Sequence, residues 1–312
     1  MVLMAVLAPA LLQAETAANL LIQGHADEAI ASLESATKNS PNDAAAHNLL
    51  CRAYYSIGKW DRSISACEKA VALDGNNSMY HLWLGRAYGE KADDSSVFSA
   101  PGWAKKTHLE FETAVRLDPS NVEARSDLSE YYVDAPGFMG GGTDKAEAQA
   151  QALEKLAPAK AHLVRAEIAQ KNKDMDSAER EYRAAIQASK GSASAWFDLA
   201  SFFHKAGRPD DMDKALNETI AAAKTEPDVL VDSASLLIKA ERNCGLAIQI
   251  LHRYLDSETK SEAAPAFKAD YLLGTALEKQ GNKQAAAEAY SAALALARDF
   301  TPAQEGLKRV TR

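Results

Sequence analysis

A repeated pattern of small and large residues constrains the fold more than any other feature of the sequence. Four stretches align by eye: "GHADEAIASLESA", "GKWDRSISACEKA", "NKDMDSAEREYRAA" and "GNKQAAAEAYSAA". In each stretch a turn precedes small and large residues at helical spacing. The small residue that opens the pattern recurs at Ala29, Ser63, Thr107, Ala146, Ala178, Met212, Ala247 and Ala286. An upstream small series falls at Ala17, Cys51, Gly85, Ser129, Ala166, Ala200, Ser235 and Gly274.

Two small series per unit predict pairs of closely packed helices. Small residues on facing helices let two backbones approach, while neighbouring Leu, Tyr and Phe side chains fill the space between them. One pair cannot bury its apolar face alone, so each pair stacks on the next. We therefore expect an all-α solenoid of about eight antiparallel helix pairs over residues 15–300. Residues 301–312 begin near Pro302 and have a charged face, which is typical of a capping helix.

The commonest spacing between units is about 34 residues, and the pattern resembles the tetratricopeptide repeat family. The resemblance extends from about Ala10 to Phe300 and is closest in "NLLCRAYYSIGKWDRSISACEKAVALD" and "YLLGTALEKQGNKQAAAEAYSAALAL". Met212, Arg165 and Tyr254 stand where the family prefers other residues. The resemblance implies a right-handed superhelix and a protein or peptide partner.

In that family the first helices of successive units line a binding groove. Matched positions place Arg52 and Arg86 one unit apart, where they could bind a carboxylate bidentately. The alternative is that these residues are ordinary solvated charges. The predicted groove comprises Asn48, Arg52, Tyr55, Arg86, Glu130, Phe197, His204, Lys239 and Tyr271.

Two units carry extra residues, which predict enlarged turns at about 89–106 and 133–145. The second insertion, "YYVDAPGFMGGGTDKAEA", lacks the G-x-x-x-x-G-K-[ST] motif of a phosphate-binding loop. We expect Pro136 to stop one helix, the glycines to provide backbone freedom, and Thr143 or Asp144 to cap the next helix.

Both insertions contain Ala-Pro-Gly followed by an aromatic residue. Equivalent turns of neighbouring units lie on one edge of a solenoid, and such insertions often form the binding face. This pattern predicts an aromatic edge that binds a partner. Alternatively, these side chains fold back and pack on their own helices. The predicted edge comprises Phe98, Pro101, Trp103, Phe138 and Met139.

The bulk composition argues against several function classes. The formal charge is −8 and the Lys and Arg residues are scattered, so no basic stripe is available for a nucleic acid. No spacing of Cys or His residues indicates a metal site, and no Ser/His/Asp or Cys/His arrangement indicates catalysis. We therefore expect no catalytic residue, no metal and no cofactor.

Cys51 and Cys67 are predicted to lie on opposite helices of one pair at nearly the same height. A disulfide between them needs Cα atoms within about 7 Å, and two buried thiols are the alternative. Residues 1–14, "MVLMAVLAPALLQA", look like the apolar region of a signal peptide cleaved after Ala14. The alternative is that this run is the first apolar helix of the fold. Residues 1–14 are too short to span a bilayer. The sequence thus predicts a bacterial protein that is periplasmic or secreted, and otherwise cytoplasmic.

The function expected from these observations is non-catalytic binding of protein or peptide partners, as a scaffold or adaptor. The alternative is a solute-binding accessory protein that uses the aromatic edge as a pocket wall. A deep apolar pocket beneath Trp103 and Phe138 would favour the second function.

Overall fold

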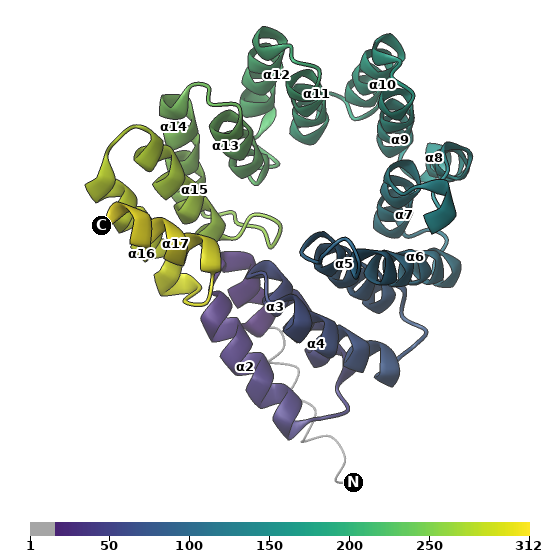
Figure 1. The fold of residues 1–312 in the computed structure, drawn as a ribbon, viewed down its shortest axis with the longest axis horizontal. Coiled ribbons are helices and arrows are strands. Elements are labelled where there is room, and N and C mark those ends of the chain that lie inside the picture. The colour runs from purple at the N-terminus through teal and green to yellow at the C-terminus, as the bar shows by residue number, and fades with distance from the viewer. Residues whose placement is uncertain (1–15) are drawn as a thin grey trace. The chain divides into compact units, whose positions relative to one another are not determined.

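The computed structural model describes residues 16–312, so the predicted leader at residues 1–14 lies outside the described part (Figure 1). All regular elements of residues 16–312 are α-helices, apart from one 3-10 turn, η1 (Gly137–Met139). The all-α prediction is confirmed. None of the helices in residues 16–312 combines the length and the apolar character needed to cross a membrane.

Residues 16–312 form eight successive helix pairs and one final helix. The first pair joins a helix at residues 16–23 to α2 (Ala26–Asn39). The following pairs are α3 (Ala44–Ser56) and α4 (Trp60–Leu73), α5 (Ser78–Asp93) and α6 (Ala100–Leu117), α7 (Val122–Asp134) and α8 (Thr143–Leu156), α9 (Pro158–Lys171) and α10 (Met175–Ala188), α11 (Ala193–Lys205) and α12 (Pro209–Ala222), α13 (Val229–Lys239) and α14 (Cys244–Leu255), and α15 (Ala266–Lys279) and α16 (Lys283–Leu296). The final helix is α17 (Thr301–Val310).

The helices belong to two compact units. One unit contains residues up to Lys59 together with Leu216–Arg312, and the other contains Trp60–Ala215. The first unit is therefore built from both ends of the described chain. The second contains α4 to α11 and the first half of α12, and its core includes Leu82, Phe111, Leu128, Leu153 and Val164.

The small positions of the repeat are buried, but several of them pack against rings. A Cβ atom added to Gly85 would lie 2.5 Å from the Phe111 ring, and one added to Gly274 would lie 2.6 Å from the Tyr290 ring. Close approach in these pairs thus depends on glycine opposite an aromatic side chain. The seventh unit departs from the predicted register, because Ser235 is exposed and Ala234 is buried instead.

The two insertions are accommodated differently. Residues 89–106 are mostly helical, because the extra residues lengthen α5 and α6 to 16 and 18 residues and leave a turn of only 94–99. The expectation of one large turn there was wrong. Residues 135–142 form an irregular turn that contains η1. The N-cap of α8 is Gly142 and makes no side-chain hydrogen bond, so neither Thr143 nor Asp144 is the capping residue.

Tyrosine hydrogen bonds link the second helix of one pair to the first helix of the next. Tyr88 donates to Glu68 at 2.7 Å and Tyr132 donates to Glu112 at 3.0 Å, each across 20 positions of sequence. Tyr54 donates to Glu34 across the same separation. A shared polar contact thus recurs at three successive junctions.

Candidate partner-binding site

A hollow in the second unit lies between the first helices of three pairs, α7, α9 and α11. A cavity of about 260 Å³ is lined there by Ser126, Asp127, Glu130, Lys160, Leu163, Val164, Glu167, Tyr182, Asp198, Ser201 and Lys205. A second cavity of about 220 Å³ shares Glu130, Glu167 and Lys205 and adds Asp134 and Lys171. We call the two together the acidic pocket, since they are lined by five carboxyl groups and three lysines.

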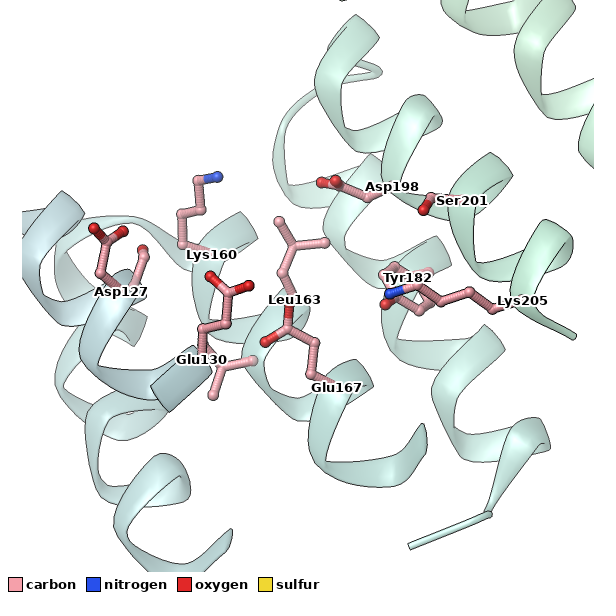
Figure 2. A pocket seen from close by; sticks show the side chains of 11 residues that line it. Asp127, Glu130, Lys160, Leu163, Glu167, Tyr182, Asp198, Ser201 and Lys205 are labelled. Carbon is pink, nitrogen blue, oxygen red and sulfur yellow. The ribbon is translucent and has the colours of Figure 1, made fainter. Parts of the chain in front are cut away.

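The repeat register brings the carboxyl groups together. Glu130 and Glu167 each directly follow the small residue of the upstream series, Ser129 and Ala166, which is completely buried. They therefore occupy equivalent positions on α7 and α9. Figure 2 shows their carboxyl groups pointing toward one another, with Asp198 of α11 on the other side of the pocket.

The pKa values of the buried glutamates are raised in this cluster of carboxyl groups. Burial raises the pKa of Glu167 to about 7, and the nearby carboxylates of Glu130, Asp198 and Asp134 act in the same direction. The pKa of Glu130 is raised as well, first by desolvation and then by Asp127 and Asp134. Negative charge in this pocket is therefore only partly compensated by the protein itself.

Lys171 and Lys205 lie beside Glu130 and Glu167 in the lining of the acidic pocket. Lys171 donates to the backbone carbonyl of Asp134 at 3.2 Å. Lys205 reaches toward Tyr182 and Glu167 in Figure 2 and lowers the pKa of both glutamates somewhat. Within residues 16–312, neither Glu130 nor Glu167 has a cationic side chain within ion-pairing distance of 4.0 Å.

Tyr182 forms the floor of the pocket from the second helix of its pair, α10. Its hydroxyl donates to Gln170 at 2.6 Å, and its ring packs against Phe202 with centroids 5.2 Å apart. Burial raises the pKa of Tyr182, and the carboxylates of Glu167 and Asp198 raise it further. This tyrosine therefore remains a neutral hydrogen-bond donor in the lining of the pocket.

The predicted groove residues divide between the two units. Glu130 is the one predicted groove residue that lines the acidic pocket. Arg86 donates from Nε to Asp127 at 2.6 Å and from Nη2 to Glu123 at 3.0 Å. Arg52 forms a two-pronged pair with Glu262. The chain's own carboxylates thus take the place that we had expected for a partner's carboxylate.

The remaining groove predictions lie on the first helices α3, α11, α13 and α15. Asn48 is buried in α3, and its Oδ1 has no hydrogen-bond partner among the described residues. Tyr271 in α15 packs against Tyr290 and Phe300. Tyr55 in α3 and Phe197 and His204 in α11 are half-buried, and Lys239 in α13 is exposed.

The predicted aromatic edge contains two kinds of side chain. Trp103 packs on Tyr88 with ring centroids 5.7 Å apart, and the Lys106 ammonium lies 4.6 Å from the Trp103 ring. In contrast, Phe98 is 94% exposed and Phe138 is 87% exposed. Pro101 is exposed and Met139 is half-buried. The alternative of local packing therefore describes Trp103, whereas the two phenylalanines point into solvent.

Sequence reasoning missed Glu167, Asp198 and Lys205. The signal was present in the repeat register, because Glu167 stands at the position equivalent to Glu130, and Lys171 and Lys205 at the position equivalent to Asp134. The fifth unit contributed no residue to the predicted groove. What the register cannot show is that α7, α9 and α11 leave space between them.

The chemistry available in the acidic pocket is binding of positive charge. The lining contains Ser126 and Ser201 but no histidine or cysteine, so it holds no Ser/His or Cys/His arrangement for nucleophilic catalysis. No group of three His, Cys, Asp or Glu side chains in residues 16–312 is arranged to hold a metal ion.

Comparisons with known proteins agree with this architecture. Family models of the tetratricopeptide repeat match residues 20–87, 171–227 and 232–299. Among solved structures, yeast Tom70 is 14% identical with a TM-score of 0.56, and the alignment covers 92% of this chain and 58% of the Tom70 chain.

A thermophilic tetratricopeptide repeat protein of Thermus thermophilus is 20% identical with a TM-score of 0.51. This alignment covers 61% of our chain and 98% of that chain. No curated protein sequence matches the chain. The structural similarities concern the fold alone, and the family models cover more than half of the sequence. The chain belongs to the tetratricopeptide repeat family.

Proposed function

We propose that this protein is a non-catalytic scaffold whose acidic pocket binds a basic side chain of a protein partner. Repeat arrays of this family present side chains on a surface whose curvature is set by packing between neighbouring units. Binding at such a surface needs little reorganisation. The partner class that fits the pocket is an extended segment with exposed Lys or Arg residues, and a nucleic acid is disfavoured by the same carboxylates.

The five carboxyl groups that line the acidic pocket carry this proposal, and the pKa of Glu167, raised to about 7, supports it. The raised pKa means that ionisation of Glu167 costs free energy in the protein on its own, because the charged carboxyl is partly desolvated and lies near others. A cation that enters the pocket relieves this cost and gains charge-assisted hydrogen bonds. Lys and Arg side chains have both the charge and the reach to do so.

Calorimetric titration with short peptides tests the proposal. We would use an acetylated, amidated heptapeptide that alternates lysine and glycine, with its glutamate counterpart for comparison. The lysine peptide is expected to bind, and E167Q should weaken it about tenfold, because a charged hydrogen bond contributes about 1.5–3 kcal/mol. Affinity should rise from pH 6 to pH 8, since Glu167 ionises over that interval.

The matched control is E305Q, which removes the same charge from an exposed position on α17. It should leave binding unchanged. Equal binding of the two peptides, or equal loss in both variants, would show that the acidic pocket has no specific role. Capture of partners from the native organism by wild type and by the E130Q/E167Q double variant extends the test to natural ligands.

We also propose that the protein acts outside the bacterial cytoplasm. The apolar run and small-residue site of residues 1–14 support this location. N-terminal sequencing of the chain from its native cells is expected to begin at Glu15, and a chain that begins at Met1 would exclude cleavage.

The solute-binding alternative receives little support from the inserted turn. A cavity of about 360 Å³ lies there, but its lining includes Pro136, Gly137, Thr143 and Lys171 and neither Trp103 nor Phe138. The scaffold is the function that the geometry supports best.

A further inference from the structure

The first unit contains contacts between residues that are far apart in the repeat array. In a solenoid each repeat ordinarily contacts only its neighbours in sequence. Here α2 lies beside α16 (Figure 1), and hydrogen bonds join residues separated by 210, 242 and 271 positions. The first helices of the described chain are therefore packed directly against its last repeats.

The strongest of these contacts joins Arg52 of α3 to Glu262. Arg52 Nε donates to Glu262 Oε1 at 2.8 Å, and Nη2 donates to Oε2. Both side chains are partly buried, with 28% and 17% of their surface exposed. A two-pronged guanidinium–carboxylate pair in such a setting is more directional and less screened than a surface pair.

Two further contacts join Asp27 of α2 to the turn before α17, and Lys59, in the turn after α3, to the start of α17. The Asp27 carboxylate accepts from the backbone N–H of Arg298 at 3.1 Å and lies 3.5 Å from its Nε. Lys59 Nζ donates to Thr301 Oγ1 at 3.4 Å. We call these three contacts, made by Asp27, Arg52 and Lys59, the clasp.

The loop that carries Glu262 is held in place by its own contacts. Tyr254 is completely buried and donates from its hydroxyl to the carbonyl of Ala264. Lys260 donates to the carbonyls of Tyr254 at 2.9 Å and Leu255 at 3.1 Å. Glu262 is thus presented to Arg52 from a fixed loop, and this arrangement is what a specific closing contact requires.

Close backbone packing accompanies the polar contacts. Gly24 has φ +83°, and a Cβ atom placed on it would lie 2.4 Å from the backbone nitrogen of Ala266. Leu21 and Phe267 are both buried near this junction. Close backbone approach at Gly24 and Ala266 and burial of Leu21 and Phe267 thus accompany the polar contacts.

From these contacts we propose that residues 16–59 form a closable clasp on the last repeats, held by carboxylate contacts and released when these are screened or removed. The chain leaves the first unit after Lys59 and returns to it at Leu216, so both sides of the clasp belong to that one unit. The clasp is a conformational device that controls whether the first and last repeats of the first unit are packed together.

Hydrogen exchange read by mass spectrometry on the full chain tests this proposal. R52E should speed exchange about tenfold in peptides covering 257–268 and 297–303 and leave α9 and α10 unchanged. Raising NaCl from 50 to 500 mM should have the same effect on wild type. The charge swap R52E/E262R should restore protection. R183E is the matched control, since it breaks an exposed pair with Glu179 within α10.

Unchanged exchange at 297–303 in both R52E and high salt would overturn the clasp, as would a charge swap that fails to restore protection. If R52E accelerates exchange in α9 and α10 as well, it has unfolded the whole chain. In that case the milder substitution E262Q is tested instead, by comparing exchange in peptides 257–268 and 297–303 with exchange in α9 and α10. None of these outcomes depends on the acidic pocket, so this proposal and the proposed function can fail separately.

Discussion

At the scale of single residues, one position of the repeat carries charged side chains in successive units. Glu130 and Glu167 occupy one register position on successive first helices, and Arg52 and Arg86 occupy the same position in earlier units. The arginines are paired with carboxylates of the chain, whereas the glutamates face each other across the acidic pocket. One register position thus gives an ion pair within the chain in some units and lines the acidic pocket in others.

The raised pKa of Glu167 predicts a pH-dependent stability. Between its ordinary value of 4.5 and about 7, the native protein binds more protons than the unfolded chain, so the free energy of unfolding falls as pH rises. The E167Q substitution removes this pH-dependent contribution to the free energy of unfolding. The variant should match wild type near pH 4.5 and be more stable at pH 8, as urea unfolding at both values would measure. E305Q should show no such difference, and a constant offset of E167Q at both pH values would contradict the assignment.

The cysteines provide a second test at this scale. Cys51 and Cys67 are completely buried, and Cys244 is a free cysteine. The predicted Cys51–Cys67 disulfide leaves one thiol to react with Ellman's reagent after denaturation without reductant. Three reactive thiols would exclude the bond.

At the scale of helices, the repeat depends on glycines that face rings. Gly85→Ala in α5 should destabilise the protein by about 1–3 kcal/mol, because the added methyl group overlaps the Phe111 ring and the helices must separate. Thermal unfolding measures this cost. A loss below a few tenths of a kcal/mol would show that the α5–α6 junction yields freely.

Gly102→Ala is the control for that substitution. Gly102 also lies in a helix, α6, but nothing lies within 4 Å of its added Cβ atom. Removing a helical glycine should stabilise the protein by up to about 1 kcal/mol. The change in stability is expected to have opposite signs at the two glycines. This difference separates the effect of packing from the effect of helix propensity.

At the scale of the whole molecule, repeats that contact mainly their neighbours predict local loss of stability. Leu153 is completely buried in the core of the second unit, and Leu153→Ala should cost about 2–5 kcal/mol. Hydrogen exchange should accelerate in α7 to α10 and stay at the wild-type rate in α15 to α17. Uniform acceleration along the chain would indicate that the two units unfold together.

The helix pairs were predictable because their signal is local and repeated. Small residues such as Ala146 and Ala185 recur at equivalent positions of successive units and are buried there. Their periodicity therefore reveals both the helix and its buried face. The error at Ser235 and the helical course of residues 89–106 arise where a unit departs from the common spacing. Among the residues of the candidate site, the sequence indicated Glu130. It did not indicate that Glu167, Asp198 and Lys205 line the same pocket.

The sequence by itself determined the all-α repeat, its eight pairs and the residues that each pair buries, since these depend on contacts between neighbours in the chain. Only the tertiary structure decided which first helices leave a cavity between them and that Arg52 meets Glu262. Both depend on how helices of different pairs are placed in space, which contacts between neighbours in the chain do not reveal.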